Sequence, residues 1–219
     1  MNAQLQSTDP EFDYVIAGAG SAGCVLANRL SADGKYSVLL LEAGPKDSNI
    51  WIHVPLGYGK LFKDRSVNWM YQTEPEPELK GRQVFQPRGK TLGGSSSING
   101  LLYVRGQHED YDRWRQRGNA GWGYDDVLPY FRKAENQTRG ADPFHGVGGP
   151  LPVSDMIVAD PLSKAFIDAA IETGLPYNPD FNGATQEGVG LFQTTTRKGR
   201  RASTSVAYLA PAKNRPNLR

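Results

Sequence analysis

The sequence predicts an α/β protein that becomes α+β over its whole length, and three observations predict it. Residues 12–17 (FDYVIA) and 36–41 (YSVLLL) are short apolar runs of the kind that form buried strands. Between them lie the glycine-rich turn GAGSAG, residues 18–23, and a run with apolar residues at helical spacing. Further along, residues 188–205 alternate between apolar and polar side chains, which predicts a half-exposed antiparallel strand.

The first half of this prediction is a single strand, turn, helix, strand unit. Val25, Leu26 and Leu30 define the apolar face of the helix, and the second strand follows within about 30 residues of the first. Because crossovers between parallel strands are right-handed, we expect the two strands to be parallel neighbours in one sheet. The unit is therefore Rossmann-like.

The segments after this unit are less regular. Residues 45–90 contain many Pro, Gly and aromatic residues with weak periodicity, so we expect mostly extended loop that covers another part of the molecule. Helical patterns occur within residues 108–137, interrupted by a turn at 118–121, and again at 161–173.

Composition excludes several classes of protein. The chain of 219 residues has 25 basic and 23 acidic residues, a balance that does not favour nucleic acid as a partner. No apolar run is long enough for a transmembrane segment, and residues 1–11 lack the layout of a signal peptide. The single cysteine, Cys24, and three dispersed histidines indicate neither a disulfide framework nor a metal site. We expect a cytoplasmic protein, with peripheral association with a membrane left open.

The glycine turn has the physical features of a dinucleotide site. Gly18 permits a tight turn, Gly20 lets a pyrophosphate approach the backbone, and Gly23 lets the helix pack closely on the strand. Glu42 ends the second strand, where its carboxylate would accept hydrogen bonds from ribose hydroxyls and disfavour NADP. A purely structural crossover with a solvated Glu42 is the alternative. The candidate residues are Gly18, Ala19, Gly20, Ser21, Ala22, Gly23, Glu42 and Ala43.

A second glycine-rich stretch favours FAD over NAD. An NAD enzyme would continue with further strand and helix units, yet residues 45–105 show no such alternation. They end instead in GKTLGGSSSING, residues 89–100, which we call the glycine-serine loop. This stretch of small residues fits a second contact layer on a long, extended cofactor, and a serine-rich surface loop is the alternative.

These motifs together resemble the glucose-methanol-choline (GMC) oxidoreductases. The glycine-serine loop, with Tyr103, Gly106 and Asp112 at their spacing, is similar to a signature of that family. The dinucleotide turn, NWMYQTEPE at 68–76, FHGVGGPLPV at 144–153 and the closing GRRASTSVAYLAPAKNRPNLR are similar to it as well. The resemblance extends from about residue 12 to residue 219, and within the family it points towards choline-dehydrogenase-like alcohol dehydrogenases.

The resemblance implies how FAD would be bound. Trp69 would lie near the cofactor. The residues implied beside the pyrophosphate and ribitol are Leu92, Gly93, Gly94 and Ser95, and those implied beneath the flavin ring are Asn99, Gly100, Leu101 and Leu102. Some relatives attach the ring covalently through a histidine of this loop. Ile98 occupies that position here, so we expect FAD to be held non-covalently.

The implied activity is oxidation of the CH–OH group of an alcohol, choline or a primary alcohol, by hydride transfer to flavin N5. The electron acceptor remains open. The resemblance implies an FAD-binding domain at 12–155 and the start of a substrate-binding domain at 156–219. It also implies truncation at the carboxyl end, a catalytic base beyond residue 219 and inactivity of this stretch alone. An NAD-dependent dehydrogenase and a non-catalytic nucleotide-binding fragment are the alternative interpretations.

Two further expectations concern charged residues. The basic run RKGRR at 197–201 has no interleaved aromatic residues and is interpreted as a solvated turn rather than a phosphate or nucleic-acid site. His108 and His145 lie in polar segments and are interpreted as surface residues.

Overall fold

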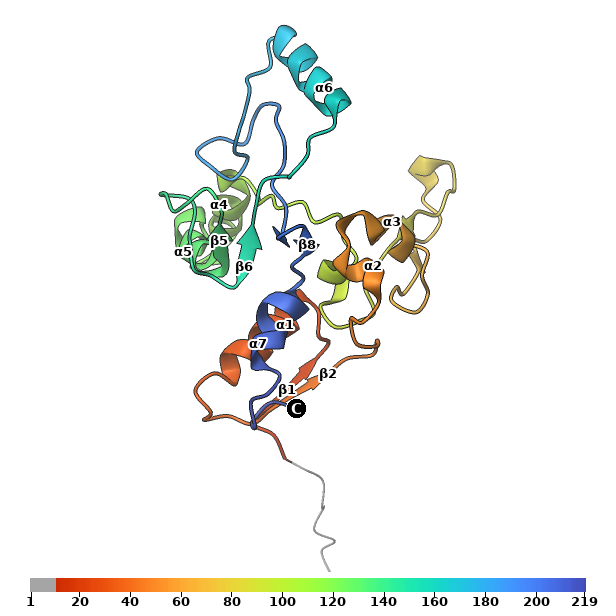
Figure 1. The fold of residues 1–219 in the computed structure, drawn as a ribbon, viewed down its shortest axis with the longest axis vertical. Coiled ribbons are helices and arrows are strands. Elements are labelled where there is room, and N and C mark those ends of the chain that lie inside the picture. Colours follow the sequence, from red (N-terminus) through yellow and green to blue (C-terminus); the bar gives the residue numbers. More distant parts are fainter. Residues whose placement is uncertain (1–10) are drawn as a thin grey trace, which may run out of the picture.

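The computed structural model describes residues 11–219. Several small groups of helices and strands are arranged around the middle of the molecule (Figure 1). The strands are β1 (Tyr14–Ala17), β2 (Val38–Leu41), β3 (Tyr71–Gln72), β4 (Phe85–Gln86), β5 (Glu135–Gln137), β6 (Leu151–Val153), β7 (Thr196–Arg197) and β8 (Arg200–Arg201). The α-helices are α1 (Ser21–Leu30), α2 (Ile50–His53), α3 (Tyr58–Leu61), α4 (His108–Gln116), α5 (Tyr124–Ala134), α6 (Pro161–Glu172) and α7 (Ala210–Ala212). Short 3-10 turns are η1 (Pro55–Gly57), η2 (Pro77–Leu79) and η3 (Gly94–Ser97), and η4 (Ser205–Leu209) is a π-helical turn.

The predicted strand, helix, strand unit is confirmed. β1 and β2 pair in parallel with Tyr14 opposite Val38 and Ala17 opposite Leu41, and α1 connects them. Ile16, Ala27 and Val38 form the buried core between the helix and the sheet. The unit therefore presents the end of β1, the start of α1 and the end of β2 along one edge, where the candidate dinucleotide residues lie.

The prediction of a buried strand is confirmed for β1 as a strand, but only part of it is buried. Ile16 is buried, but Tyr14 is 39% exposed and Val15 is 60% exposed. The apolar pattern marked the strand correctly, since a pattern reports which side chains favour burial. The pattern does not tell which of these side chains are covered by other parts of residues 11–219.

Residues 45–90 fold more than the sequence predicted. Asn49 caps α2 by accepting the N–H of Trp51 at 3.0 Å, and Pro55 supplies the fixed backbone angle at the start of η1. The two short helices and the loop share a small core that also includes a residue of the glycine-serine loop; its members are Ile52, Leu61, Val67 and Ile98. These residues thus form a second packed unit beside the glycine-serine loop.

The two helices predicted within residues 108–137 are confirmed as α4 and α5. Asp110 and Asp126 each accept the N–H of the residue that precedes the helix, Gln107 at 2.9 Å and Gly123 at 3.0 Å. These contacts satisfy amides that the helix leaves free. The parallel pairing of β5 with β6, which follows α5, was not predicted.

The long antiparallel strand predicted at 188–205 is much shorter in the structure. Thr194 forms isolated antiparallel bridges to Leu102 and Ser154, and β7 and β8 then form a two-residue hairpin. The turn of this hairpin needs left-handed backbone at Lys198 (φ +50°) and Gly199 (φ +73°), which interrupts the alternation. Antiparallel pairing is therefore present in this segment, but only as isolated bridges and a short hairpin.

The end of the chain returns to the first unit. η4 lies against α1, where the Asn28 side chain donates to the Tyr208 carbonyl at 2.7 Å. The N–H of Val38 donates to Asn217 and that of Leu40 to Arg219, each at 2.8 Å, which adds a short parallel segment beside β2. The division into domains at residue 156 stays a prediction. The last residues of segment 156–219 contact the unit formed by β1, α1 and β2.

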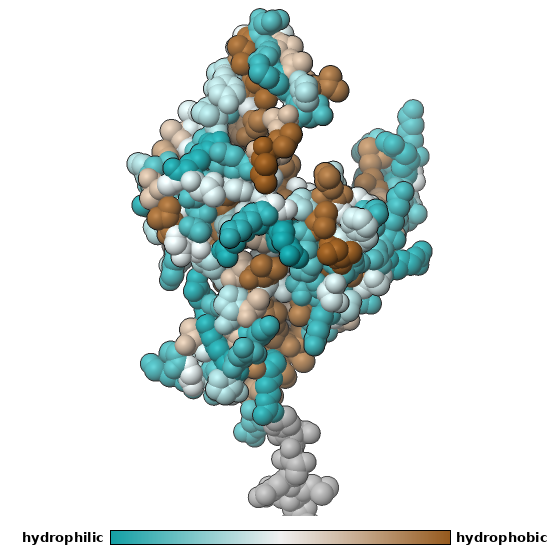
Figure 2. Space-filling model, viewed as in Figure 1, coloured by the Kyte–Doolittle hydropathy of each residue, from teal (hydrophilic) through white to brown (hydrophobic). Residues whose placement is uncertain are grey.

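Apolar side chains are exposed on α6 and on the segment before it. Leu162 and Phe166 are 79% and 70% exposed, and Ile157 and Val158 are about as exposed. Figure 2 shows brown, hydrophobic atoms among teal ones at the projecting end of the molecule, which carries α6 in Figure 1. None of the helices formed by residues 11–219 combines the length and apolarity that crossing a membrane requires.

Candidate functional site

The three glycines of the first turn have different local environments. Gly18 has φ +95°, in the region that favours glycine. A Cβ at Gly20 would meet no atom within 4 Å, whereas a Cβ at Gly23 would overlap the carbonyl oxygen of Gly18. Gly18 and Gly23 therefore serve the turn and the packing of α1, and the backbone at Gly20 faces open space. Ser21 and Ala22, at the start of α1, are exposed.

The glycine-serine loop packs directly against this turn. The N–H of Gly93 donates to the carbonyl of Ala19 at 2.7 Å. Gly94 has φ +53°, and a Cβ there would lie 2.8 Å from the Cα of Gly20. A backbone so close leaves no room for a side chain. Two glycine-rich segments 70 residues apart in sequence thus form one surface.

The consecutive serines of this loop stabilise its own shape. Ser95 accepts the N–H of Gly89 at 3.1 Å, and Ser97 donates to the carbonyl of Leu92 at 2.7 Å. Ser96 donates to the carbonyl of Gly93 at 2.6 Å and accepts the N–H of Thr204 at 3.0 Å. These hydroxyls, which all belong to the 3-10 turn η3, satisfy backbone groups outside it, so they tie the turn to the flanking parts of the loop and to Thr204.

Glu42 is bound to the glycine turn through both carboxylate oxygens. Oε2 accepts the N–H of Ala19 and Oε1 accepts the N–H of Gly44, each at 2.8 Å. A carboxylate offers about four acceptor directions, so roughly two remain for a ligand. Glu42 therefore fixes the end of β2 to the turn and still has acceptor capacity.

These segments enclose an open groove of about 540 Å³. It is lined by Ala17, Gly18, Gly20, Leu41, Glu42, Ala43, Trp69, Gly89 and Gly94. Six of these were predicted from the sequence. Ala17, Leu41 and Gly89 were not among the predicted site residues, although Ala17 and Leu41 end the two predicted strands and Gly89 begins the glycine-serine loop. The groove joins the first glycine turn, the end of β2 and the glycine-serine loop.

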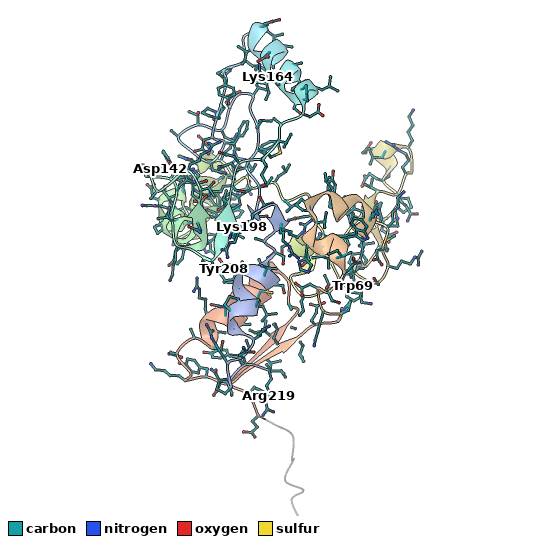
Figure 3. All side chains as sticks on the ribbon, in the orientation of Figure 1. Trp69, Asp142, Lys164, Lys198, Tyr208 and Arg219 are labelled. Carbon is teal, nitrogen blue, oxygen red and sulfur yellow. The ribbon has the colours of Figure 1, made fainter. Side chains whose placement is uncertain are left out.

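Trp69 forms the aromatic wall of this groove. Its ring stacks on that of Tyr71 with centroids 5.8 Å apart, and the Nζ of Lys90 lies 4.5 Å from its centroid. The side chain is 40% exposed and lies on the flank that carries the covering loops (Figure 3). Tyr71 and Lys90 both contact the indole, and its exposed part gives the groove an aromatic edge.

The remaining predicted residues lie at or behind the loop and do not line the groove. Leu92 packs on the core formed by Ala19, Cys24, Ala207 and Tyr208. Asn99 and Gly100 are exposed, as is 56% of Leu102. Leu101 is buried and has φ +66°, a strained conformation for a leucine. Residues 99–102 thus form a turn, exposed except at Leu101, that does not line the groove.

The interpretation of residues 197–201 as a solvated turn is wrong for Arg201. Arg197, Lys198 and Arg200 are exposed, but Arg201 is only 2% exposed and donates to carbonyl groups around the glycine-serine loop. Burial lowers the pKa of its guanidinium to about 10. Arg201 begins a buried segment of the chain. The residues that follow it, Ala202, Ser203, Thr204 and Ser205, are buried as well.

The interpretation of His145 as a surface residue is also wrong. The ring is 3% exposed; Nδ1 lies 3.0 Å from Glu135, and Nε2 lies 2.9 Å from Asp180. Arg105 donates to the same Glu135 carboxylate at 2.9 Å. His108 is half-buried and stacks on Tyr124 with centroids 3.5 Å apart. Both histidines belong to packed structure outside the groove.

The protonation of His145 follows from these contacts. Hydrogen bonds to Asp180 and Glu135 raise its pKa to about 9, against the effect of burial. Burial opposes ionisation of Asp180, but the hydrogen bonds from His145 and from the Asn182 backbone lower the pKa of that carboxyl. Asp142 completes a group of three possible ligand side chains. Both ring nitrogens are engaged with carboxylates, so we interpret the group as an ion-pair network.

Comparison with known proteins gives a consistent set of relatives. The family model described as GMC oxidoreductase matches residues 12–219. The chain is 51% identical over 208 residues to an alcohol dehydrogenase [acceptor] of Pseudomonas putida and 50% identical over 210 residues to an oxygen-dependent choline dehydrogenase of Vibrio vulnificus. These alignments cover 94% and 95% of this chain. They cover 38% of each relative, so the chain spans well under half of their length.

Solved structures agree with this pattern. Pyridoxine 4-oxidase from Mesorbium loti superposes with a TM-score of 0.91 at 37% identity, covering 95% of this chain and 42% of that one. An FAD-dependent oxidoreductase from Chaetomium thermophilum superposes with a TM-score of 0.86 at 30% identity, covering 95% and 38%.

Proposed function

The chain belongs to the GMC oxidoreductase family, and on that premise we propose that it forms the FAD-binding part of an enzyme that oxidises the CH–OH group of an alcohol. The observation that carries the proposal is the groove between the two glycine-rich segments. There, the backbone of Gly20 faces open space, and Glu42 retains acceptor capacity.

The residues present fit a dinucleotide cofactor. The open face at Gly20 suits a pyrophosphate, which the free amides at the start of α1 would stabilise. Glu42 would accept hydrogen bonds from ribose hydroxyls, and Trp69 offers an aromatic surface. When bound, FAD supplies hydride acceptance at flavin N5. The chain's own task is to bind and orient the cofactor.

The exposed turn at residues 99–102 fits the flavin end of such a cofactor. Asn99 and Gly100 present backbone without bulky cover, and Leu102 adds an apolar surface. We propose that this turn lies beneath the ring and restricts water there. Ile98 is 1% exposed and offers no nucleophile, which supports non-covalent attachment.

The base that accepts the substrate proton is proposed to lie outside these 219 residues. His53 is hydrogen-bonded to the Asp47 carbonyl at 2.7 Å, and the other two histidines are packed as described above. None of the three lines the groove. We propose an alcohol such as choline or a primary alcohol as substrate, following the names of the relatives.

The test is to purify the full-length protein, meaning the complete open reading frame that carries this sequence, and to measure its cofactor and activity. We expect a yellow protein with FAD and reduction of an artificial dye with choline or a primary alcohol. Residues 1–219 expressed alone, with FAD added, should show no turnover. A colourless protein that binds NAD would refute the FAD assignment. Full turnover by residues 1–219 would place the base within this sequence.

A further inference from the structure

Arg201 is a buried cation whose contacts converge on the glycine-serine loop. Its Nε donates to the carbonyl of Ile52 at 2.7 Å, and Nη1 donates to the carbonyl of Ser96 at 3.1 Å. Nη1 also donates to the side-chain oxygen of Asn99, and Nη2 to the backbone carbonyl of Asn99, each at 2.7 Å. One guanidinium thus connects α2, η3 and the exposed turn.

The partners of this cation are unusual for a buried charge. They are amide and carbonyl oxygens, and no carboxylate of residues 11–219 forms an ion pair with Arg201. Burying a guanidinium without a carboxylate is costly, so stability alone gives little reason for an arginine here. The planar fork does offer donors in fixed directions, which suits holding several carbonyls at once.

The Asn99 side chain connects Arg201 to Leu101, whose backbone is strained. Its side-chain oxygen accepts both from Arg201 and from the N–H of Leu101, at 3.0 Å. Leu101 has φ +66°, a left-handed backbone conformation that is strained for a residue other than glycine. Arg201 therefore supports the turn that brings Asn99, Gly100 and Leu102 to the surface.

We propose that Arg201 is a positioning residue that fixes the shape of the turn at residues 99–102 and thereby the affinity for flavin. This inference rests on the proposed function for its flavin part. The other part, that Arg201 fixes the shape of the turn, does not depend on the proposed function. Arg201 sits at the base of the β7–β8 hairpin, whose tip at Lys198 lies near the centre of the view in Figure 3. Its exposed neighbour Arg200 provides a control of equal charge.

The experiment compares Arg201→Gln, Arg201→Lys and Arg200→Gln in the full-length protein. Hydrogen exchange of residues 93–102 is measured in the flavin-free form, and FAD affinity and the visible circular dichroism of bound flavin are measured below the unfolding temperature. We expect Arg201→Gln to speed exchange in this segment and weaken FAD at least tenfold. Arg201→Lys should have loop exchange and FAD affinity close to those of Arg201→Gln, because an ammonium group lacks the planar fork of donors. Arg200→Gln should behave as wild type.

Each outcome decides the inference. Unchanged loop exchange and unchanged FAD affinity in folded Arg201→Gln overturn it. A lower unfolding temperature with normal FAD affinity also overturns it, since Arg201 is then only part of the packing. Should Arg201→Gln fail to fold, Arg201→Lys takes its place, and wild-type affinity in that variant overturns the requirement for the fork. Wild-type protein without flavin refutes the proposed function, while faster loop exchange in Arg201→Gln still supports the positioning role.

Discussion

The N–H of Gly93 donates a hydrogen bond of 2.7 Å to the carbonyl oxygen of Ala19. This bond joins the glycine-serine loop to the dinucleotide turn across 74 residues of sequence. Both groups are backbone, so the contact requires the two segments to approach without intervening side chains. The groove proposed for FAD exists because of this approach.

Gly20→Ala should remove flavin without harming the fold. Gly20 has φ −74° and ψ −165°, which alanine adopts freely, and a Cβ there meets no protein atom. The methyl group would instead occupy the space proposed for the pyrophosphate. The measurement is the ratio of flavin to protein absorbance in the purified full-length protein. Gly59→Ala, also open and without strain, is the control. Stoichiometric flavin in Gly20→Ala would contradict the assignment.

Gly94→Ala should destabilise the protein itself. Alanine there must adopt φ +53°, and its methyl group would lie 2.8 Å from the Cα of Gly20, so the loop must move. Strain of this kind costs about 1 to 3 kcal/mol. Thermal unfolding of the flavin-free protein checks the prediction, with Gly100→Ala from the same loop as control, because a Cβ at Gly100 meets nothing. Equal unfolding temperatures for the two variants would show that the loop and the turn are not packed as described.

Glu42→Ala should affect both folding and cofactor binding. It frees the amides of Ala19 and Gly44 and removes the acceptor proposed for ribose. Hydrogen bonds to a charged group contribute about 1.5 to 3 kcal/mol, so we expect FAD affinity to weaken by that amount. Titration with FAD and unfolding of the flavin-free protein measure the two effects separately. A loss of stability with unchanged affinity would assign Glu42 to the fold alone.

Flavin should be released by acid. Ile98, at the position where some relatives carry the attaching histidine, is buried against Ile52, Leu61 and Val67. It offers no atom for a covalent bond. Precipitation of the holoprotein with acid should leave FAD in the supernatant, and flavin that stays with the pellet would show another attachment site.

Stability should fall as the pH rises from about 6.5 to about 9 because of His145. The folded state raises the pKa of His145 from 6.5 to about 9, so the protonated ring is favoured by folding. This contribution is complete below pH 6.5 and is lost as the pH approaches the folded value. A shift of this size corresponds to about 3 kcal/mol as an upper figure. Denaturant unfolding at several pH values measures it. The decrease of the free energy of unfolding between pH 6.5 and pH 9 should be smaller in His145→Gln than in wild type. An equal decrease in both proteins would contradict the prediction.

Local features were predictable where one short segment contains the whole signal. The strand, turn, helix, strand unit follows from apolar runs and from glycines whose spacing has a direct steric reason, such as the overlap at Gly23. The two helices of residues 108–137 likewise follow from their periodicity. The burial of His145 was missed because its partners Glu135 and Asp180 are distant in sequence and charged, and such residues are normally exposed.

The sequence by itself determined the strand, turn, helix, strand unit and the composition of the glycine-serine loop, since both depend on the conformations that short runs of residues permit. Only the tertiary structure decided that the loop lies on the turn, that Trp69 joins the same groove, and that Arg201 is buried beneath Asn99. The reason is that these contacts are made largely to backbone groups: Gly93 donates to the carbonyl of Ala19, Trp69 donates through its backbone N–H to the carbonyl of Arg88, and Arg201 donates to the carbonyls around the loop. Every residue carries these groups, so their partners leave no mark in the sequence and are chosen by the packing of the whole chain.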